Sequence, residues 1–252
     1  DKLDPSLTNV DEAQGTMNGV PLVMPGKYGS HLGVIDLQLE QDGEEWNVAT
    51  GTGAVRAINK DNADVKKEVV DSVKAAHEGT IDYVRQAVGT TTATIHSYFS
   101  QIQDDPSIQI VNDAQTIYVK NKLKGTAYEN LPVLSAGAPF KAGTRSDAEY
   151  YTYIPAGELA IKNVADLYLY DNTLAVLKVT GADVKEWLEM SAGQFNQIDV
   201  NSKGEQQLIN TEYRSYNYDV IDGVTYEIDV TQPAKYDPNG KVINEGASRI
   251  VN

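Results

Sequence analysis

The sequence predicts an α+β fold in which a β segment, a long helix and a mixed region follow one another. Residues 20–58 show the alternating apolar and polar pattern of strands. Residues 61–88 carry apolar side chains at helical spacing, and residues 90–252 mix short helices with strands. At about 150 residues per domain, the length suits one or two domains. We therefore divide the chain into 1–58, 61–88 and 90–252.

The first piece is expected to hold a β-hairpin. Apolar and polar residues alternate over 35–40, and Asp42-Gly43 favours a turn before a return strand with Trp46 and Val48. A piece of about 58 residues buries little apolar surface by itself, so we expect it to belong to a larger body.

The clearest helix is expected over residues 61–88. Residues 61–64 supply a capping residue and an acidic first turn, and Gly89 is a suitable terminator. Gly79 lies inside the helix and costs roughly 1 kcal/mol relative to alanine. One apolar face is formed by Val65, Val69, Val73, His77, Ile81, Val84 and Val88. A helix between a β segment and a change in composition indicates a connector between domains.

Three further helices are expected in the last piece. The apolar spacing predicts a short helix over 95–102 and a longer one from Asp105-Pro106 to Gly125. Another helix follows Gly181. The inward side chains of the second of these helices would be Ile110, Ala114 and Ile117.

Strands are expected over 131–134 and 173–179. The strongest hairpin signal covers 216–230, with its turn at Asp222-Gly223. Residues 248–252 look like the opening of a strand with no partner after it. We therefore expect the sequence to be a fragment of a longer chain.

The composition excludes several classes of protein. The chain has 21 Lys+Arg against 36 Asp+Glu, a net charge of −15, and no cysteine. Disulfides and thiolate metal sites are thus excluded. No window approaches the roughly 20 apolar residues of a membrane span. The acidic balance opposes binding to a nucleic-acid polymer, whereas a single nucleotide needs only a few local donors.

Local motifs for catalysis are absent. His31, His77 and His96 are far apart and show no metal-ligand spacing, and His77 is better explained as a packing residue on the helix. There is no Gly-x-Ser-x-Gly elbow and no glycine-rich phosphate loop. With 36 carboxylates, any acidic pair drawn from the sequence carries no information. We expect no catalytic residue and no metal ligand in this chain.

Tyrosine is the one suggestive residue type, with 15 copies against 3 of phenylalanine. A tyrosine ring suits stacking on a nucleobase or a sugar ring. The alternative is strand surface, where tyrosine is common. The tyrosines near expected loops are Tyr150, Tyr151, Tyr153, Tyr168, Tyr170, Tyr213 and Tyr216.

Several segments, taken together and in order, resemble the bacterial 2′,3′-cyclic-nucleotide 2′-phosphodiesterase/3′-nucleotidases of the 5′-nucleotidase superfamily. They are residues 18–26, 29–37, 103–106, 131–141, 165–174, 186–189, 191–199 and 216–224. The last two, Ser191-Ala192-Gly193-Gln194-Phe195-Asn196-Gln197-Ile198-Asp199 and Tyr216-Asn217-Tyr218-Asp219-Val220-Ile221-Asp222-Gly223-Val224, are the most specific.

The resemblance implies a two-domain hydrolase. Its N-terminal metallophosphatase domain would hold two divalent metal ions, and a helix would join that domain to a C-terminal nucleotide-binding domain. Residues 1–58 would be the last strands of the metal domain, 61–88 the joining helix and 90–252 a truncated nucleotide-binding domain. The metal-binding motifs are not in this sequence, so this chain alone is expected to be inactive.

The resemblance also implies substrate-binding residues. An aromatic-x-Asn motif matches Tyr170-Asp171-Asn172, where the ring would stack on the base and the Asn172 amide would bond to it. Residues 135–140 stand where the superfamily has an Asn-Gly-Gly-x-x-Arg loop, and either Lys141 or Arg145 would supply the positive charge. The implied set is Ser135, Phe140, Lys141, Arg145, Tyr170, Asn172, Tyr216 and Asn217.

Two functions follow from these expectations. The first is nucleotide recognition within a secreted phosphoesterase that acts on 2′,3′-cyclic nucleotides and 3′-nucleotides. The second is a non-catalytic extracellular module that binds a nucleotide or a sugar. The resemblance and the absence of cysteine place the parent outside the cytoplasm, in the periplasm, the cell wall or the medium.

Overall fold

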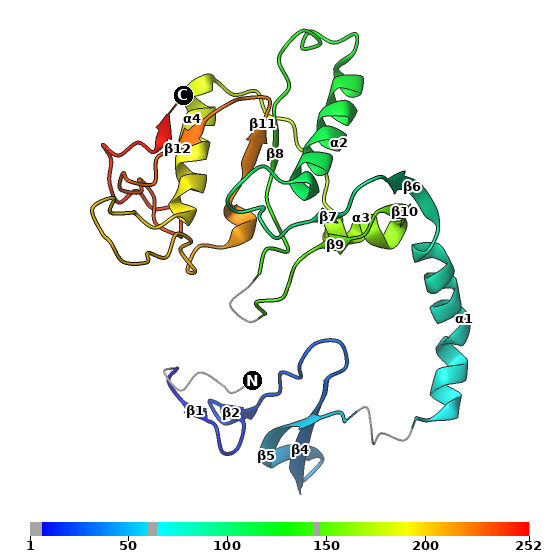
Figure 1. Cartoon of the computed structure of the whole chain (residues 1–252). Coiled ribbons are helices and arrows are strands. Elements are labelled where there is room, and N and C mark those ends of the chain that lie inside the picture. Colours follow the sequence, from blue (N-terminus) through cyan, green and yellow to red (C-terminus); the bar gives the residue numbers. More distant parts are fainter. Residues whose placement is uncertain (1–6, 60–64, 144–146, 252) are drawn as a thin grey trace. The chain divides into compact units, whose positions relative to one another are not determined.

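The computed structural model describes residues 7–59, 65–143 and 147–251. The chain divides into two units, Asp1–His77 and Glu78–Asn252. The first unit is drawn in blue to cyan in Figure 1 and the second in colours from cyan to red. Among the described residues, no helix is long and apolar enough to cross a membrane.

The first unit is built on the expected hairpin, which the structure confirms. Strand β4 (His31–Asp42) pairs antiparallel with β5 (Glu45–Ala57), with a register shift between Gln38 and Leu39. Gly43 has a φ of +63°, as the turn between the strands requires. The apolar side chains of these strands remain largely exposed, among them Ile35, Leu37, Leu39, Trp46 and Val48.

A small sheet precedes this hairpin in the same unit. Strands β1 (Val10–Asp11), β2 (Thr16–Met17) and β3 (Val20–Pro21) form it in that order. Gly15 lies between them with a φ of +64°, and a Cβ there would collide with the carbonyl of Gly53 on β5. A glycine is therefore required where this loop crosses the hairpin.

Helix α1 (Lys67–Val84) is confirmed as a helix but is shorter than expected. It ends at Val84, and β6 (Ala87–Thr91) begins three residues later, so the expected terminator Gly89 lies in a strand. The expected capping residues 61–64 lie outside the described residues. None of the residues of α1 is buried, although its valine face was expected to pack.

The described residues of the second unit form four two-stranded antiparallel pairs. Each pair joins two strands that are distant in sequence. The pairs are β6 with β10 (Gly157–Ala160), β7 (Ile95–His96) with β9 (Tyr153–Ile154), β8 (Ser135–Gly137) with β11 (Val220–Asp222), and β12 (Glu227–Ile228) with β13 (Ile250–Val251).

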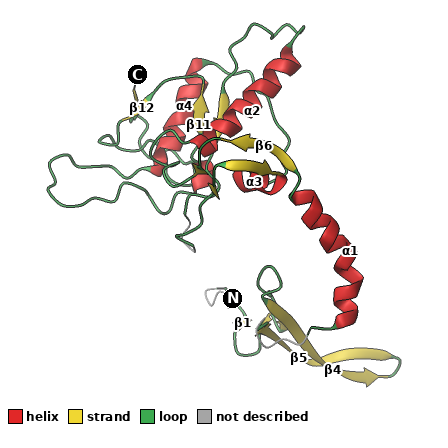
Figure 2. Ribbon diagram, turned by 45° about the vertical axis from the view of Figure 1, so that its right-hand side comes forward, coloured by secondary structure: helices red, strands yellow, loops and turns green. Residues whose placement is uncertain are grey.

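Helices pack between these strand pairs (Figure 2). Helix α2 (Pro106–Leu123) begins at its N-cap Asp105, whose carboxylate accepts from the backbone N–H of Ser107 at 2.9 Å. The other helices are α3 (Ile161–Leu167), α4 (Gly181–Ser191) and the 3₁₀ turns η1 (Ala192–Gln194) and η2 (Ser215–Asn217). Helices α2 and α4 start where their capping residues predict.

The core of the second unit lies around α4. One buried cluster joins Leu188 and Ala192 to Ile221 on β11 and Ile250 on β13. A second cluster consists of Phe195, Tyr213 and Tyr218, with the Phe195 and Tyr218 rings edge to face at 5.5 Å. These contacts tie α4 to the last strands of the chain.

The structure contradicts several of the helices and strands predicted from the sequence. Residues 95–102 form β7 and a turn instead of a helix, because Ile95 pairs with Ile154. Residues 131–134 precede the strand, which starts at Ser135. Residues 173–179 have no regular structure. The apolar pattern of such short segments fits either state until a partner strand is known.

The hairpin expected over 216–230 is also wrong. Its first arm, β11, pairs with β8, and its second arm, β12, pairs with β13. Residues 250–251 form a strand, as expected for the final segment, and their partner β12 lies before them in the sequence.

The buried side of α2 differs from the one expected. Ile110, Ala114 and Ile117 are exposed, whereas Ser107, Ile108, Asn112 and Val119 are buried. Because the buried face of α2 carries polar side chains, above all Asn112, the spacing of apolar residues in the sequence does not reveal which face is buried.

Candidate nucleotide-binding site

Four of the predicted substrate-binding residues come together where two segments lie side by side. Residues 139–143 carry Phe140 and Lys141, and residues 166–172 carry Tyr170 and Asn172. The Phe140 ring meets the Tyr170 ring edge to face, with 5.7 Å between centroids. We call these two segments and their side chains the aromatic site.

The second segment presents alternate residues to the first. Helix α3 ends at Leu167, and Tyr168 is extended with φ −132° and ψ 102°. Asp166 forms an ion pair with Lys141, and the rings of Tyr168 and Tyr170 both contact Phe140. Asp166 thus faces the first segment from the last turn of α3, and the two tyrosines face it from the irregular segment that follows the helix.

The Tyr170 ring is accessible to a ligand. Its side chain is 62% exposed, although its edge contacts Phe140. An exposed ring held at its edge can offer a face to a planar ligand.

The amide of Asn172 lies beside the same rings. Its Nδ2 donates a hydrogen bond of 3.2 Å to the hydroxyl of Tyr168. The Tyr168 ring is in turn edge to face with Phe140 at 5.1 Å. The amide is thereby linked to the aromatic contacts.

Lys141 is engaged within the protein. Its Nζ forms the ion pair with Asp166 and lies 5.1 Å from the centre of the Tyr150 ring, and its side chain is 15% exposed. Its carbonyl accepts a hydrogen bond from the Ser97 hydroxyl, which also accepts from the N–H of Thr152 at 2.9 Å. The loop that carries Phe140 is thus fixed to the β7–β9 pair.

Gly143 closes this loop with a φ of +70°. A Cβ at Gly143 would lie 2.8 Å from the hydroxyl oxygen of Tyr151. Residues 144–146, and with them the predicted Arg145, lie outside the described residues.

Ser135 is placed differently from the residues above. It is 5% exposed on β8, and its hydroxyl lies 2.9 Å from Asn112 Oδ1 and 3.0 Å from Gln115 Oε1, both on α2. These contacts fix β8 against α2. Both of these hydrogen-bonding contacts lead from Ser135 to α2 and not to the aromatic site.

Tyr216 and Asn217 lie in the 3₁₀ turn η2 and not in the expected strand, because the N–H of Tyr218 bonds to the carbonyl of Ser215 at 3.0 Å. Tyr216 is 52% exposed. The carbonyl of Asn217 accepts from the hydroxyl of Tyr213 at 3.1 Å. Within the described part of the chain, no hydrogen bond or ring contact joins this turn to the aromatic site.

The residues around η2 are electrostatically perturbed. Burial raises the pKa of Asp219, and the bond of 2.7 Å that Trp187 Nε1 donates to it acts in the opposite direction. Burial, helped by the nearby Asp219, raises the pKa of Tyr213 to about 12. Both groups therefore favour their neutral forms more than usual.

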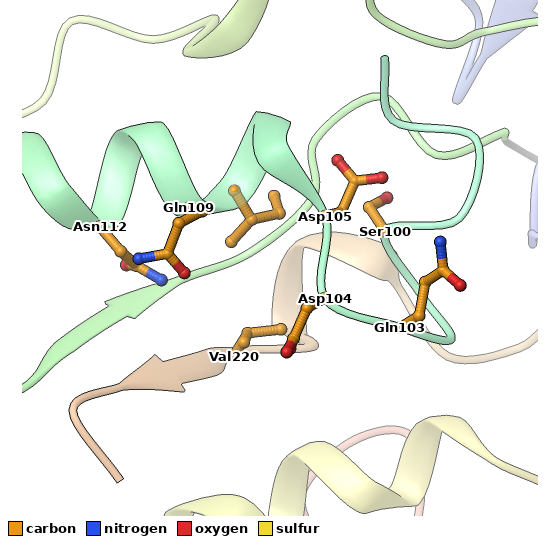
Figure 3. A pocket seen from close by; sticks show the side chains of 8 residues that line it. Ser100, Gln103, Asp104, Asp105, Gln109, Asn112 and Val220 are labelled. Atoms are coloured by element: carbon orange, nitrogen blue, oxygen red, sulfur yellow. The ribbon is translucent and has the colours of Figure 1, made fainter. Parts of the chain in front are cut away.

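A small pocket of about 10 Å³ lies between α2, β11 and the loop before α2 (Figure 3). It has room for about one water molecule. Asp105 belongs to its lining and is 5% exposed, and its Oδ2 has no hydrogen-bond partner. The lining residues are Ser100, Gln103, Asp104, Asp105, Ile108, Gln109, Asn112 and Val220.

Across the described ranges, no three His, Cys, Asp or Glu side chains gather in a way that could hold a metal ion. The two-metal chemistry of the resembling hydrolases therefore does not fit the described residues of this chain, and we derive no step through metal ions.

Sequence reasoning missed two residues of the aromatic site. Tyr168 was noted only as one of the tyrosines near loops, and Asp166 was not singled out. Asp166 lies in the last turn of α3 and Tyr168 in the irregular segment after it, so no single periodic pattern in the sequence marks the two together with Tyr170.

An α+β unit with an exposed aromatic ring and an amide side by side defines a candidate ligand-binding domain. A family model described as "5′-nucleotidase, C-terminal domain" matches residues 87–252. The chain belongs to this family. The match starts at the first residue of β6 and includes every residue of the aromatic site.

Two curated proteins are similar over almost the whole chain. One is the trifunctional nucleotide phosphoesterase protein YfkN of Bacillus subtilis, 58% identical over 95% of this chain and 16% of that protein. The other is the 2′,3′-cyclic-nucleotide 2′-phosphodiesterase/3′-nucleotidase of Yersinia enterocolitica, 50% identical over 98% of this chain and 39% of that protein. The chain spans less than half the length of either.

A solved structure agrees on the fold. The chain superposes with a TM-score of 0.57 on a Staphylococcus aureus protein assigned as a 5′-nucleotidase, at 18% identity, over 94% of this chain and 40% of the other. The similarity extends to both units of the chain.

Proposed function

We propose that this chain is the substrate-recognition part of a phosphoesterase that hydrolyses 2′,3′-cyclic nucleotides and 3′-nucleotides to nucleoside and phosphate. The observation that carries the proposal is the exposed Tyr170 ring beside the Asn172 amide. An aromatic ring stacks on a base and an amide bonds to its edge. The name of the Yersinia enterocolitica relative gives these substrates, and the name of the Bacillus subtilis relative gives nucleotide phosphoesters in general.

The aromatic site suits the nucleoside end of the substrate better than the phosphate. Its lysine, Lys141, is already paired with Asp166, and the whole chain carries a net charge of −15. Stacking on a single ring contributes roughly 1–3 kcal/mol, so binding to this site alone is weak. The phosphate would be held by another domain, together with the two divalent ions, and turnover would require that domain.

The test is binding of adenosine and 3′-AMP to the chain, measured by titration calorimetry, with Tyr170→Ala as the variant. We expect saturable binding that Tyr170→Ala weakens at least about five-fold, the loss expected for one stacking contact. Tyr128→Ala is the matched control, because Tyr128 is also about half exposed and lies on a different loop. Equal affinities for the Tyr170→Ala variant and the wild type would remove the stacking role.

The enzyme assignment has its own test. In the full-length hydrolase, Tyr170→Ala is expected to raise KM for 3′-AMP and to leave turnover of p-nitrophenyl phosphate, which has no base, unchanged. Phosphatase activity of this chain alone with Mn²⁺ or Zn²⁺ would contradict the proposal that the metal site lies in another domain.

A second candidate is a non-catalytic extracellular module that binds a sugar or a nucleotide. A group of rings favours it: Tyr98 stacks on His96 at 4.9 Å and meets Tyr151 edge to face at 5.1 Å, and Tyr98 is 46% exposed. Sugars bind to such exposed aromatic faces. Saturable binding of chitotriose or cellotriose that Tyr98→Ala abolishes, without nucleoside binding, would favour this module.

Location outside the cytoplasm is part of both proposals. Its support is the absence of cysteine together with the family resemblance. Fractionation of cells that express the full-length protein, with detection by antibody, would test it: recovery in the cytoplasm alone contradicts the proposal.

A further inference from the structure

We propose that Tyr168 is a positioning residue that holds the Asn172 amide and the Tyr170 ring in one arrangement for the base of a ligand. This inference rests on the proposed nucleotide recognition. It assigns a role to a residue that has no need to touch the ligand itself.

The first step is the hydrogen bond from Asn172 Nδ2 to the Tyr168 hydroxyl, 3.2 Å long. An asparagine amide has two N–H groups and one carbonyl oxygen. One N–H is used by Tyr168, so Oδ1 and the second N–H remain for a ligand. An amide held in this way offers one acceptor beside one donor, which is the pattern that pairs with the edge of a nucleobase.

The second step is the ring contact that fixes Tyr168. Its ring and that of Tyr170 both meet Phe140 edge to face, at 5.1 Å and 5.7 Å and at interplanar angles of 80° and 71°. Phe140 thus serves as a common support for two tyrosines that are two residues apart. A shift of Tyr168 would move the support of the stacking ring and the partner of the amide together.

The third step is the ion pair that fixes the support. Phe140 is followed by Lys141, whose Nζ is paired with Asp166, two residues before Tyr168. The Asp166 carbonyl also accepts from the Thr152 hydroxyl at 2.9 Å. Both segments of the aromatic site are therefore anchored next to Phe140 and Tyr168, whereas Tyr170 and Asn172 beyond them are exposed.

The test uses Tyr168→Phe, which removes the hydroxyl and keeps the ring on Phe140. We expect about three- to ten-fold weaker binding of adenosine to the chain, as for the loss of one hydrogen bond. We also expect the two Asn172 side-chain amide proton signals in a ¹⁵N-resolved NMR spectrum of the free protein to move to the positions of an unbonded amide. Tyr128→Phe, on an exposed ring of another loop, is the matched control and should change neither.

The outcomes separate this inference from the proposed function. If the wild type binds adenosine and Tyr168→Phe binds it equally well with unmoved Asn172 signals, the positioning role is overturned and nucleotide recognition stands. If the wild type binds no nucleoside, both are overturned. In the full-length hydrolase, the expected signature is a raised KM for 3′-AMP with an unchanged kcat, and no change with p-nitrophenyl phosphate.

Discussion

Glu189 Oε2 accepts a hydrogen bond of 2.8 Å from the backbone N–H of Arg249, and the two side chains are 2% and 1% exposed. Glu189 Oε1 also accepts from the Ser248 hydroxyl at 2.7 Å and from the N–H of Ile250 at 3.0 Å. The Arg249 guanidinium donates to the carbonyls of Ala192, Phe195 and Gln232. Two opposite buried charges thus join α4 to β13 through the backbone.

We expect Arg249→Met to destabilise the protein by about 3–5 kcal/mol, because it removes the positive charge that offsets the buried Glu189 carboxylate, although the three hydrogen bonds to that carboxylate remain. The carbonyls of Ala192, Phe195 and Gln232, the first two in buried hydrogen bonds, would also lose a donor. Urea unfolding followed by circular dichroism measures the change. Arg85→Met, at an exposed arginine, is the control and should shift the free energy of unfolding by less than about 0.5 kcal/mol.

Removal of the Tyr213 hydroxyl should change how the free energy of unfolding falls at alkaline pH. Burial raises the pKa of Tyr213 to about 12 from the ordinary value of 10.0, so the folded state favours the protonated phenol. Its contribution to stability is complete below pH 10.0 and is lost as the pH rises toward about 12. We expect Tyr213→Phe to unfold at lower urea at pH 8 and to lose less stability than wild type between these pH values. If the free energies of unfolding of the two proteins depended on pH in the same way, this pKa-based prediction would be wrong.

Neutralising Asp219 should stabilise the protein at neutral pH. Burial raises the pKa of Asp219, so the folded state binds a proton more tightly than the unfolded state. Stability from this group is therefore greatest at acidic pH and is lost as the pH rises through the folded pKa. Asp219→Asn keeps an oxygen for the Trp187 N–H, and we expect a higher Tm than wild type at pH 7. The difference in Tm should shrink as the pH falls toward 3.8, the ordinary pKa of an aspartate. Asp82→Asn, at an exposed carboxylate, should show no such trend.

Loss of the cap of α2 should weaken the helix start. The Asp105 carboxylate accepts from the N–H and the hydroxyl of Ser107 at 2.9 Å and 2.6 Å. We expect Asp105→Ala to cost about 1 kcal/mol, within a range of about 0.5–2 kcal/mol for N-caps. Asp105→Ser, which keeps a capping oxygen, should recover most of the loss in urea unfolding. Equal stability of the alanine and serine variants would contradict a capping role.

Lys141 allows a test of where the phosphate is bound. Because its Nζ is paired with Asp166, we expect Lys141→Met to weaken adenosine and 3′-AMP binding by the same factor. A direct phosphate contact would weaken 3′-AMP alone. Titration of both ligands against the variant and the wild type decides between the two.

Elements with a local signal were predictable from the sequence. The Asp42-Gly43 turn defines the β4–β5 hairpin, and Asp105 and Thr180 mark the starts of α2 and α4. The pairing of β11 with β8 and of β12 with β13 was not predictable. Each of these strands has only two or three residues, and their partners are distant in sequence.

The aromatic site, too, was predictable from the sequence only in part. Tyr170 and Asn172 were predicted because a family motif contains them, and Phe140 and Lys141 because they follow a matching loop. Their mutual contacts depend on how two irregular segments meet, which no periodic pattern records. Tyr216 and Asn217 were placed on a strand because Tyr216, Tyr218 and Val220 alternate, yet a local turn forms there.

The buried Glu189 carboxylate also sets an order of events during protein synthesis. The two oxygens of this carboxylate accept hydrogen bonds from Ser248, Arg249 and Ile250, which lie 59, 60 and 61 residues later in the chain. On the ribosome, α4 therefore emerges long before the partners of its charge, and the final packing of this helix must wait until Ser248, Arg249 and Ile250 have left the exit tunnel. The second unit should complete its folding after translation of these residues and not while they are still being added.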